Sequence, residues 1–247
     1  RDVLALQSDV AQAIAQQIQA KVTPQEQTRL ARARPVDPKA YELYLKGIRL
    51  RSSAISVASD IEAWSRVRDF FQQAIETDPS YAPACAALAS WYNEGGENNY
   101  LPRTEAFSKA KALALRTLAA DDNQAEAHVA LAIALMHLDW DWAAADRESR
   151  RAVELNPNSA EVLHRRSFYL SLMGRAEEAV REVKRALELD PLRADPYHPL
   201  AFAYYCGRRY DQALEAVRMG QEINPKWDAP WARGWALREK GMYAEAI

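Results

Sequence analysis

The segment that decides the fold spans residues 160–191 and reads AEVLHRRSFYLSLMGRAEEAVREVKRALELDP. Gly174 divides it into two stretches, and each stretch repeats apolar or small residues at intervals of three and four. This spacing places Leu163 and Leu170 on one face of a helix in the first stretch. The pattern therefore predicts two amphipathic helices joined by a tight turn, with Pro191 ending the second helix.

The end of this segment recurs along the chain. ELNP at 154–157 returns as ELDP at 188–191 and as EINP at 222–225, in steps of 34 residues. A single helical hairpin leaves an apolar face uncovered, and a copy on either side covers it. No alternating Val, Ile and Thr segment closed by Asn-Gly or Asp-Gly interrupts the pattern. The predicted fold class is therefore all-α, an α-solenoid of antiparallel helix hairpins.

The periodicity predicts five complete hairpin repeats and part of a sixth within residues 38–247. The fifth repeat has Gly207 in its turn, whereas the third replaces the glycine turn with LDWDW at 138–142 and one extra residue. In the second repeat a long turn, NEGGENNYLPR at 93–103, separates the two helices. The repeats are expected at about 40–79, 82–122, 125–157, 160–191, 194–225 and, for the incomplete one, 227–247.

Residues 1–37 are predicted to form a helical linker from an upstream domain that is missing from this chain. Its first apolar stripe consists of Val3, Leu6, Val10, Ile14 and Ile18. Thr23 and Pro24 are a good cap and first residue for a second helix, which carries a basic cluster. We interpret this cluster as a solvated helix face rather than a nucleic-acid site. Because the last repeat stops at Ile247, we also expect the natural protein to continue.

Composition narrows the class of protein further. The 247 residues include only 8 glycines, and the net charge of -2 comes from both signs mixed along the chain. This balance favours neither nucleic acid nor an anionic membrane as a partner. Cys85 and Cys206 form no CxxC pair, so we expect free, buried thiols in a reducing compartment. With no apolar run of about 18 residues and no signal sequence, we expect a soluble, cytoplasmic fragment.

The repeats resemble the tetratricopeptide repeat, a pattern of about 34 residues with a turn glycine, two small residues in the second helix and a closing proline. That resemblance implies a right-handed superhelix whose first helices line a concave wall. The stretch at 2–47, together with LDWDWAAADRESRRAVELNPNSAEVLH and CGRRYDQALEAVR, is also similar to the C-terminal region of bacterial multidomain signalling proteins. In that group the upstream domain is a winged-helix transcriptional regulator, a class III nucleotide (adenylate-type) cyclase or a serine/threonine kinase.

The sequence contains no glycine-rich phosphate loop, nucleophile elbow or HExxH motif. The four histidines are scattered along the chain, and none pairs with cysteine, aspartate or glutamate at metal-ligand spacing, so we predict no catalytic residue, no metal site and no cofactor. Asp139, Asp141 and Asp146 lie near the LDWDW turn, but the glycine and terminal glutamate of a calcium loop are missing. We interpret them as residues that cap the turn.

The candidate binding residues are aromatic and histidine side chains on the first helices, where the resemblance implies a groove for a partner. They are Tyr44, His137, His164, Phe168, His198, Phe202, Tyr205, Trp231 and Trp235. If the helix phase is wrong by one residue, a side chain expected in the groove lies in the core instead. A core role therefore stays open for each of these residues. The clamp that holds carboxylates in some tetratricopeptide domains is absent from the matching positions. Arg165 and Arg166 are either contacts for an acidic ligand or surface charges.

The function predicted from these observations is a non-catalytic protein–protein interaction and regulatory module of a bacterial signalling protein. It would bind a peptide or protein segment in the concave groove, with no direct contact to nucleic acid or membrane. Two alternatives stay open. One is the sensory tail of a nucleotide cyclase or kinase whose catalytic domain lies outside the chain. The other is self-association into a homo-oligomer through the incomplete C-terminal repeat.

Overall fold

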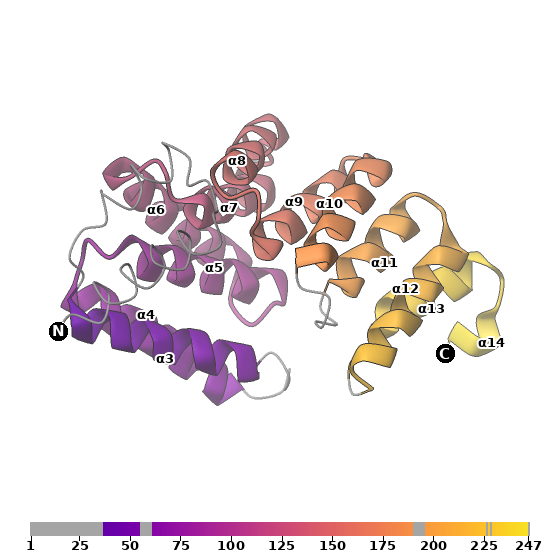
Figure 1. The fold of residues 1–247 in the computed structure, drawn as a ribbon, viewed down its shortest axis with the longest axis horizontal. Coiled ribbons are helices and arrows are strands. Elements are labelled where there is room, and N and C mark those ends of the chain that lie inside the picture. Colours follow the sequence, from indigo (N-terminus) through magenta and orange to yellow (C-terminus); the bar gives the residue numbers. More distant parts are fainter. Residues whose placement is uncertain (1–36, 55–60, 190–195, 226, 228, 247) are drawn as a thin grey trace, which may run out of the picture. The chain divides into compact units, whose positions relative to one another are not determined.

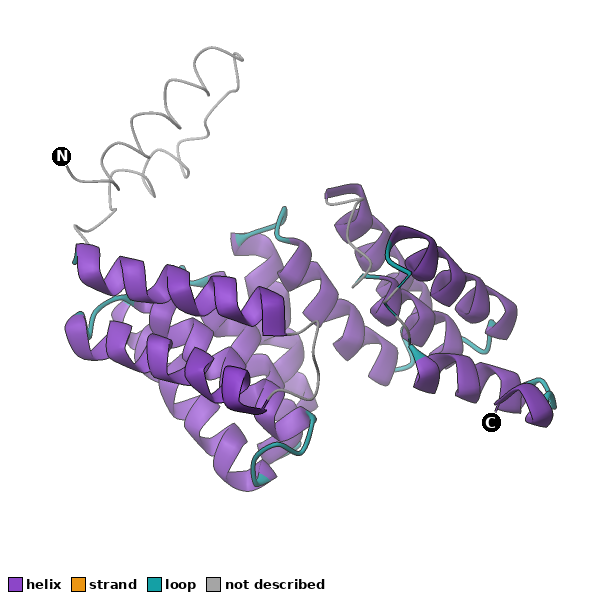
Figure 2. Cartoon of the chain, turned by 90° about the horizontal axis from the view of Figure 1, so that it is seen from below, coloured by secondary structure: helices purple, strands orange, loops and turns teal. Residues whose placement is uncertain are grey.

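A computed structural model of the chain describes residues 37–54, 61–189, 196–225, 227 and 229–246. Every regular element within these ranges is helical, and no strand occurs among them (Figures 1 and 2). The prediction of an all-α fold built from helix hairpins is therefore confirmed. The predicted linker helices and their arginine cluster lie outside the described residues. The chain divides into two compact units, Arg1–Trp91 and Tyr92–Ile247.

The first unit contains one complete hairpin. Its helices are α3 (Pro38–Ala54) and α4 (Ile61–Thr77), followed by the beginning of α5 (Ala82–Glu97). Gly47 of α3 lets the ring of Phe71 approach closely, because a Cβ at this position would lie 2.4 Å from Phe71 Cε1. Trp91 stacks on Trp64 at 3.7 Å between ring centroids and donates its indole N–H to the Trp64 carbonyl. Both contacts join α3, α4 and α5 through large side chains.

The second unit continues the series of hairpins. Its helices are the end of α5, α6 (Arg103–Ala120), α7 (Ala125–Ala134) with the π-helical turn η1 (Leu135–Asp139), α8 (Trp142–Leu155), α9 (Ala160–Leu172), α10 (Ala176–Leu189), α11 (Tyr197–Cys206), α12 (Tyr210–Ile223), α13 (Pro230–Glu239) and the short α14 (Tyr243–Ala246). Alanines mark the close contacts between helices, and Ala145, Ala179 and Ala213 are completely buried. Their small side chains allow neighbouring helix backbones to pack closely.

The turn inside each of three successive hairpins contains one residue with a left-handed backbone conformation. Trp140, Gly174 and Arg208 have φ angles of 55°, 71° and 57° and follow one another at steps of 34 residues. From the sequence, Gly207 is the expected turn residue with a left-handed backbone. Its φ is -78°, however, and the positive φ falls one residue later. The helix-ending hydrogen bond determines this position, because the Arg209 N–H donates to the Tyr204 carbonyl at 2.9 Å.

The extra residue of the third repeat is absorbed at the end of its first helix. There the chain forms η1, a π-helical turn that accommodates one additional residue. The Asp141 N–H donates to the Leu135 carbonyl, a span of six residues, whereas the matching bond in the next hairpin joins Arg175 to Leu170 and spans five. Asp141 then caps α8 by accepting from the Ala144 N–H at 2.9 Å. The repeat resumes its phase from this residue onward.

Two sequence predictions about polar segments need correction. The segment at 93–103 is only partly a turn, because α5 continues through its first residues to Glu97. Gly96 packs against the buried Phe107 ring, and a Cβ there would lie 2.9 Å from the ring. Of the three aspartates interpreted as caps, only Asp141 caps a helix. Asp139 forms an ion pair with Lys111, and Asp146 lies inside α8.

Two features are absent from the described residues. No helix among them combines the length and the apolar character that crossing a membrane requires. No cluster of histidine, cysteine or acidic side chains within the described ranges has the arrangement of a metal site.

Candidate functional site

Aromatic rings from three successive first helices contact one another in the second unit. Phe168 of α9 stacks on Phe202 of α11 at 5.2 Å, and Phe202 lies 5.7 Å from Trp231 of α13. Trp231 in turn contacts Trp235 at 4.8 Å, and Trp235 lies 5.5 Å from Tyr205. We call these five residues the aromatic cluster. Repetition of the hairpin places equivalent helix positions side by side, which explains why the rings form one row.

The aromatic cluster is partly open to solvent. Trp235 is 40% exposed, and the other four rings are half-buried because each ring covers part of its neighbour. Adjoining rings of this size are costly to leave uncovered, since large apolar area in contact with water is unfavourable. The cluster is therefore an apolar surface that is partly in contact with water.

His198 fixes the orientation of one ring in this cluster. Trp231 donates its indole N–H to His198 Nε2, and the two ring centroids lie 4.5 Å apart at an interplanar angle of 72°. Desolvation among the neighbouring side chains, with a smaller contribution from His164, lowers the pKa of His198 to about 4. A neutral imidazole is the form that accepts a hydrogen bond at Nε2. His198 thus holds Trp231 in place through its uncharged state.

A pocket adjoins the aromatic cluster. Its volume is about 20 Å³, which is room for about one water molecule. The residues that line it are Glu97, Val129, Ala132, Ile133, Met136, Ser149, Val162, Arg165, Arg166, Phe168 and Tyr169. Most of this lining is apolar, and it includes one carboxylate, Glu97, and two guanidinium groups, those of Arg165 and Arg166. Phe168 belongs both to the pocket and to the aromatic cluster, so the two features are continuous.

Arg165 is surrounded by three carboxylates. Its guanidinium donates to Glu97 at 3.1 Å, to Glu161 at 3.2 Å and to Glu94 at 3.3 Å. Burial opposes the charge of Arg165, but attraction to Glu97, Glu161 and Glu94 outweighs it and raises its pKa. Burial alone would raise the pKa of Glu97, yet Arg165 and His137 hold it below its ordinary value. Arg165 is therefore an ion-paired residue that lines the pocket, and it is not an isolated surface charge.

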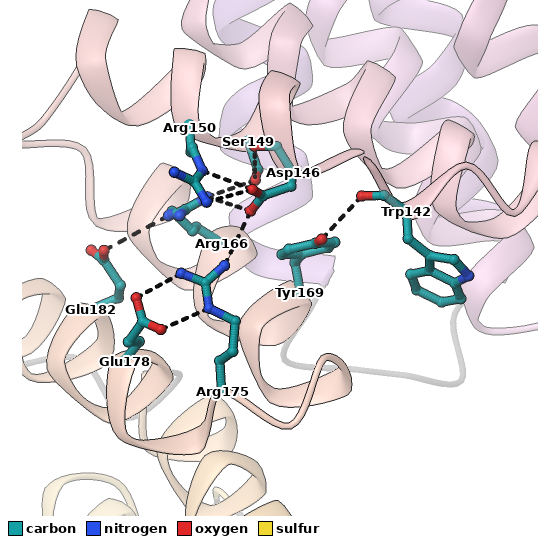
Figure 3. Close-up of polar contacts among 9 residues, drawn as sticks. All are labelled: Trp142, Asp146, Ser149, Arg150, Arg166, Tyr169, Arg175, Glu178 and Glu182. Carbon is teal, nitrogen blue, oxygen red and sulfur yellow. Dashed lines mark hydrogen bonds and ion pairs between the residues drawn. The ribbon is translucent and has the colours of Figure 1, made fainter. Parts of the chain in front are cut away.

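Arg166 occupies a second polar network, drawn in Figure 3. It donates to Ser149 Oγ at 2.8 Å and lies 3.6 Å from Asp146 and 3.8 Å from Glu182. Its side chain is only 9% exposed, so Arg166 is not a surface charge. The network joins α8, α9 and α10, and Tyr169 reinforces it by donating its hydroxyl to the Trp142 carbonyl. These contacts hold one wall of the pocket.

The remaining candidates have other surroundings. His137 stacks on Phe107 at 4.8 Å, and its Nε2 lies 3.6 Å from Glu97, too far for a hydrogen bond. That nitrogen is buried and has no hydrogen-bond partner among the described residues. Tyr44 lies in the first unit, where it contacts Phe71 and Tyr81 and packs on the hairpin core. His164 is close enough to His198 to influence its charge.

The carboxylates that surround Arg165 were not predicted from the sequence. Glu94 and Glu97 fell in a segment predicted to be a turn, although their spacing places them on one helix face. The pairing of Glu161 with Arg165 at a spacing of four was a readable signal. The contact between Glu97 and Arg165 joins residues 68 positions apart and two repeats away, and it depends on how the hairpins stack.

Comparisons with known proteins agree with this geometry at the level of the fold. No protein-family model and no curated protein sequence matches the chain. Among solved structures, the fold is similar to that of a thermophilic TPR protein from Thermus thermophilus, with a TM-score of 0.62 and 19% identity over 84% of this chain and 98% of that one. It is also similar to PilF of Pseudomonas aeruginosa, with a TM-score of 0.52 and 17% identity over 83% of this chain and 86% of that one. The chain therefore has the fold of tetratricopeptide-repeat proteins.

Proposed function

We propose that this chain is a non-catalytic protein-interaction module that binds a peptide or protein segment on the aromatic cluster. The observation that carries the proposal is the continuous row of partly exposed rings on α9, α11 and α13. The stacked hairpins hold these rings on rigid elements, which reduces the conformational entropy lost on binding.

The chemistry of the residues supports binding over catalysis. Tryptophan, tyrosine and arginine dominate the energetics of protein interfaces, and rigid rings give large contact areas at low entropic cost. At the pocket, the shifted pKa values of Glu97 and Arg165 arise from their mutual pairing. Structural ion pairs of this kind perturb pKa values without any catalytic role.

A selection experiment tests the proposal. The chain is immobilised and used to select binders from a phage-displayed library of random peptides, each about twelve residues long. The selected peptides are synthesised with a fluorescent label, and their affinity is measured by fluorescence anisotropy. We expect Trp235→Ala and Phe168→Ala to weaken binding by about tenfold or more, which corresponds to about 1.4 kcal/mol.

The matched control is Trp140→Ala. Trp140 is also a large exposed ring, 70% accessible, but it lies on the turn before α8 and outside the aromatic cluster. Its removal should leave affinity within about twofold. Circular dichroism confirms that each variant stays folded. The proposal fails if no peptide is selected, or if every selected peptide binds the Trp235 and Phe168 variants as tightly as it binds the unaltered chain.

We also propose that residues 38–247 form a tetratricopeptide array that serves as the regulatory region of a bacterial, cytoplasmic signalling protein. The support is the resemblance of the segment at 2–47 to the corresponding region of such proteins. The neighbouring reading frame tests this directly, because it should encode an effector domain such as a winged helix, cyclase or kinase. Sedimentation velocity at several concentrations separates a monomeric receptor from the alternative of self-association.

A further inference from the structure

We propose that the segment bound on the aromatic cluster is rich in proline and lies on the rings as a polyproline II helix. This inference rests on the proposed function and specifies the chemistry of the partner. It follows from three properties of the aromatic cluster: the hydrogen-bonding groups that it offers, the state of the charges around it and the arrangement of its rings.

The aromatic cluster offers hydrogen-bond donors to a ligand. Trp235 is 40% exposed, and its indole N–H has no hydrogen-bond partner among the described residues. The acceptor next to the rings, His198 Nε2, is already occupied by the indole N–H of Trp231. Arg238 interacts with the hydroxyl oxygen of Tyr205, so the hydroxyl hydrogen is the group that this residue presents to a ligand. The cluster therefore favours a ligand that supplies acceptors.

A proline-rich segment supplies acceptors without adding donors that need partners. The backbone groups within α9, α11 and α13 are paired inside these helices. An extended ligand of ordinary residues would cover some of its own N–H groups against the rings, and a buried N–H without a partner is costly. Proline has no backbone N–H, and a polyproline II helix has no internal hydrogen bonds, so its carbonyls are free to accept. The carbonyls of an α-helical ligand already accept within the helix, so Trp235 would gain less from it.

The charges around the aromatic cluster already have partners. On α13, Arg238 pairs with Glu239, and Arg233 is also engaged in an interaction. On α9, Arg165 is paired with carboxylates, and on α11 the imidazole of His198 is uncharged near neutral pH. A charged ligand residue would lose water at the rings without gaining a free counter-ion. Proline carries no charge, and its C–H groups are attracted to the negative faces of aromatic rings.

The arrangement of the rings suits the repeat of a polyproline II helix. The Trp231 ring is inclined by 63° to Trp235 and by 70° to Phe202, so these rings do not form one flat surface and present faces to a ligand in more than one direction. A polyproline II helix turns once in three residues, which is about 9 Å. Two steps along the row, 5.2 Å from Phe168 to Phe202 and 5.7 Å from Phe202 to Trp231, can span this length. Prolines three positions apart can therefore contact rings on α9 and α13.

The first experiment uses the peptides selected on the intact chain. We expect proline to be enriched above its frequency in the starting library, in pairs three positions apart. Trp235→Phe removes the indole N–H and keeps an aromatic ring, and it should weaken the best peptide by about fivefold. The matched control is Trp140→Phe, the same exchange at an exposed ring outside the aromatic cluster, and it should leave affinity within about twofold.

A second series changes the peptide and leaves the protein unaltered. Replacing a contacting proline by alanine adds a backbone N–H and loosens the polyproline II helix, and it should weaken binding by about fivefold or more. N-methylalanine at the same position again lacks the N–H and should recover most of the loss. This series decides the matter even if Trp235→Phe does not fold.

The outcomes separate this inference from the proposed function. Selected peptides that depend on Phe168 and Trp235 but show no enrichment in proline overturn the inference and leave the proposed function intact. The same conclusion follows if alanine replaces proline without loss of affinity, or if Trp235→Phe binds as tightly as the unaltered chain. Peptides that depend on neither Phe168 nor Trp235 overturn both.

Discussion

Replacing Asp146 tests whether the polar network of Figure 3 holds three helices together. Its carboxylate lies 2.6 Å from Arg150, 3.4 Å from Arg175 and 3.6 Å from Arg166. Asp146 is 20% exposed and the Arg166 side chain only 9%, so the pair is neither fully buried nor a surface pair. Removing one partner of a buried pair costs about 3–5 kcal/mol, and exposed pairs contribute about 0–1 kcal/mol. We therefore expect Asp146→Ala to lower the free energy of unfolding by about 2–3 kcal/mol.

The comparison variant is Arg166→Met, which removes the buried charge and keeps much of the aliphatic volume. Burial outweighs attraction to Asp146 and Glu182 and lowers the pKa of Arg166, so its charge is not strongly favoured where it lies. We expect Arg166→Met to change the free energy of unfolding by about 1 kcal/mol or less. Asp146 would still have Arg150 and Arg175 as partners.

The free energy of unfolding of both variants and of the double variant is measured by urea unfolding followed by circular dichroism. Urea is uncharged and does not screen the ion pairs, and the salt concentration is the same in all samples. The double variant should be more stable than Asp146→Ala alone, since it no longer contains the uncompensated Arg166. If Arg166→Met costs as much as Asp146→Ala, the buried arginine is itself a major source of stability and the reasoning is wrong.

Three further predictions concern the backbone, the core and pH. Arg208→Gly should raise the free energy of unfolding by about 0.5–1 kcal/mol and Gly174→Ala should lower it by about 1 kcal/mol, because both positions have positive φ; urea midpoints that move in the opposite directions contradict this. Gly47→Ala should lower the melting temperature, since overpacking against Phe71 costs about 1–3 kcal/mol and exceeds the gain of about 1 kcal/mol in helix propensity; an unchanged or raised value would show that the ring can move. The pKa of His198 is lowered from 6.5 to about 4, so the unfolded chain takes up this proton first and stability should fall as the pH is lowered from 6.5 to 4. The slope should be shallow because His198 is an exposed residue, and His198→Gln should reduce it; equal slopes in the two proteins argue against the effect.

Much of the fold could be predicted from the sequence because each repeat has the same spacing of apolar and small residues. The spacing around Gly174 and the recurring proline were enough to predict helix hairpins. Local rules failed where contacts between helices decide the outcome. Gly95 and Gly96 favour a turn by propensity, but the approach of Gly96 to Phe107 keeps them helical. Likewise the residue with a left-handed backbone is Arg208 and not the neighbouring Gly207. Hydrogen bonds at the end of the helix determine which position has positive φ, whether or not a glycine occupies it.

The site was less accessible from sequence. Repetition predicted which helices carry the rings, and the structure brings Phe168, Phe202 and Trp231 into contact, while their role in binding stays a prediction. The positions of Tyr44 and His137 could not be predicted, because a small difference in helix phase decides between a core contact and an open face. The ion pairs around Arg165 depend on residues from separate repeats, and no local pattern reports them.

The π-helical turn at Leu135–Asp139 has a consequence for how such a chain tolerates change in length. An added residue is taken up as a local widening of one helical turn, and the next helix begins in its usual register. Insertions at the ends of first helices should therefore leave distant hairpins undisturbed, whereas the same insertion within a packed helix would rotate every later side chain out of its contact. Lengthening at these points offers a route to reshape one stretch of the surface while the rest of the molecule keeps its architecture.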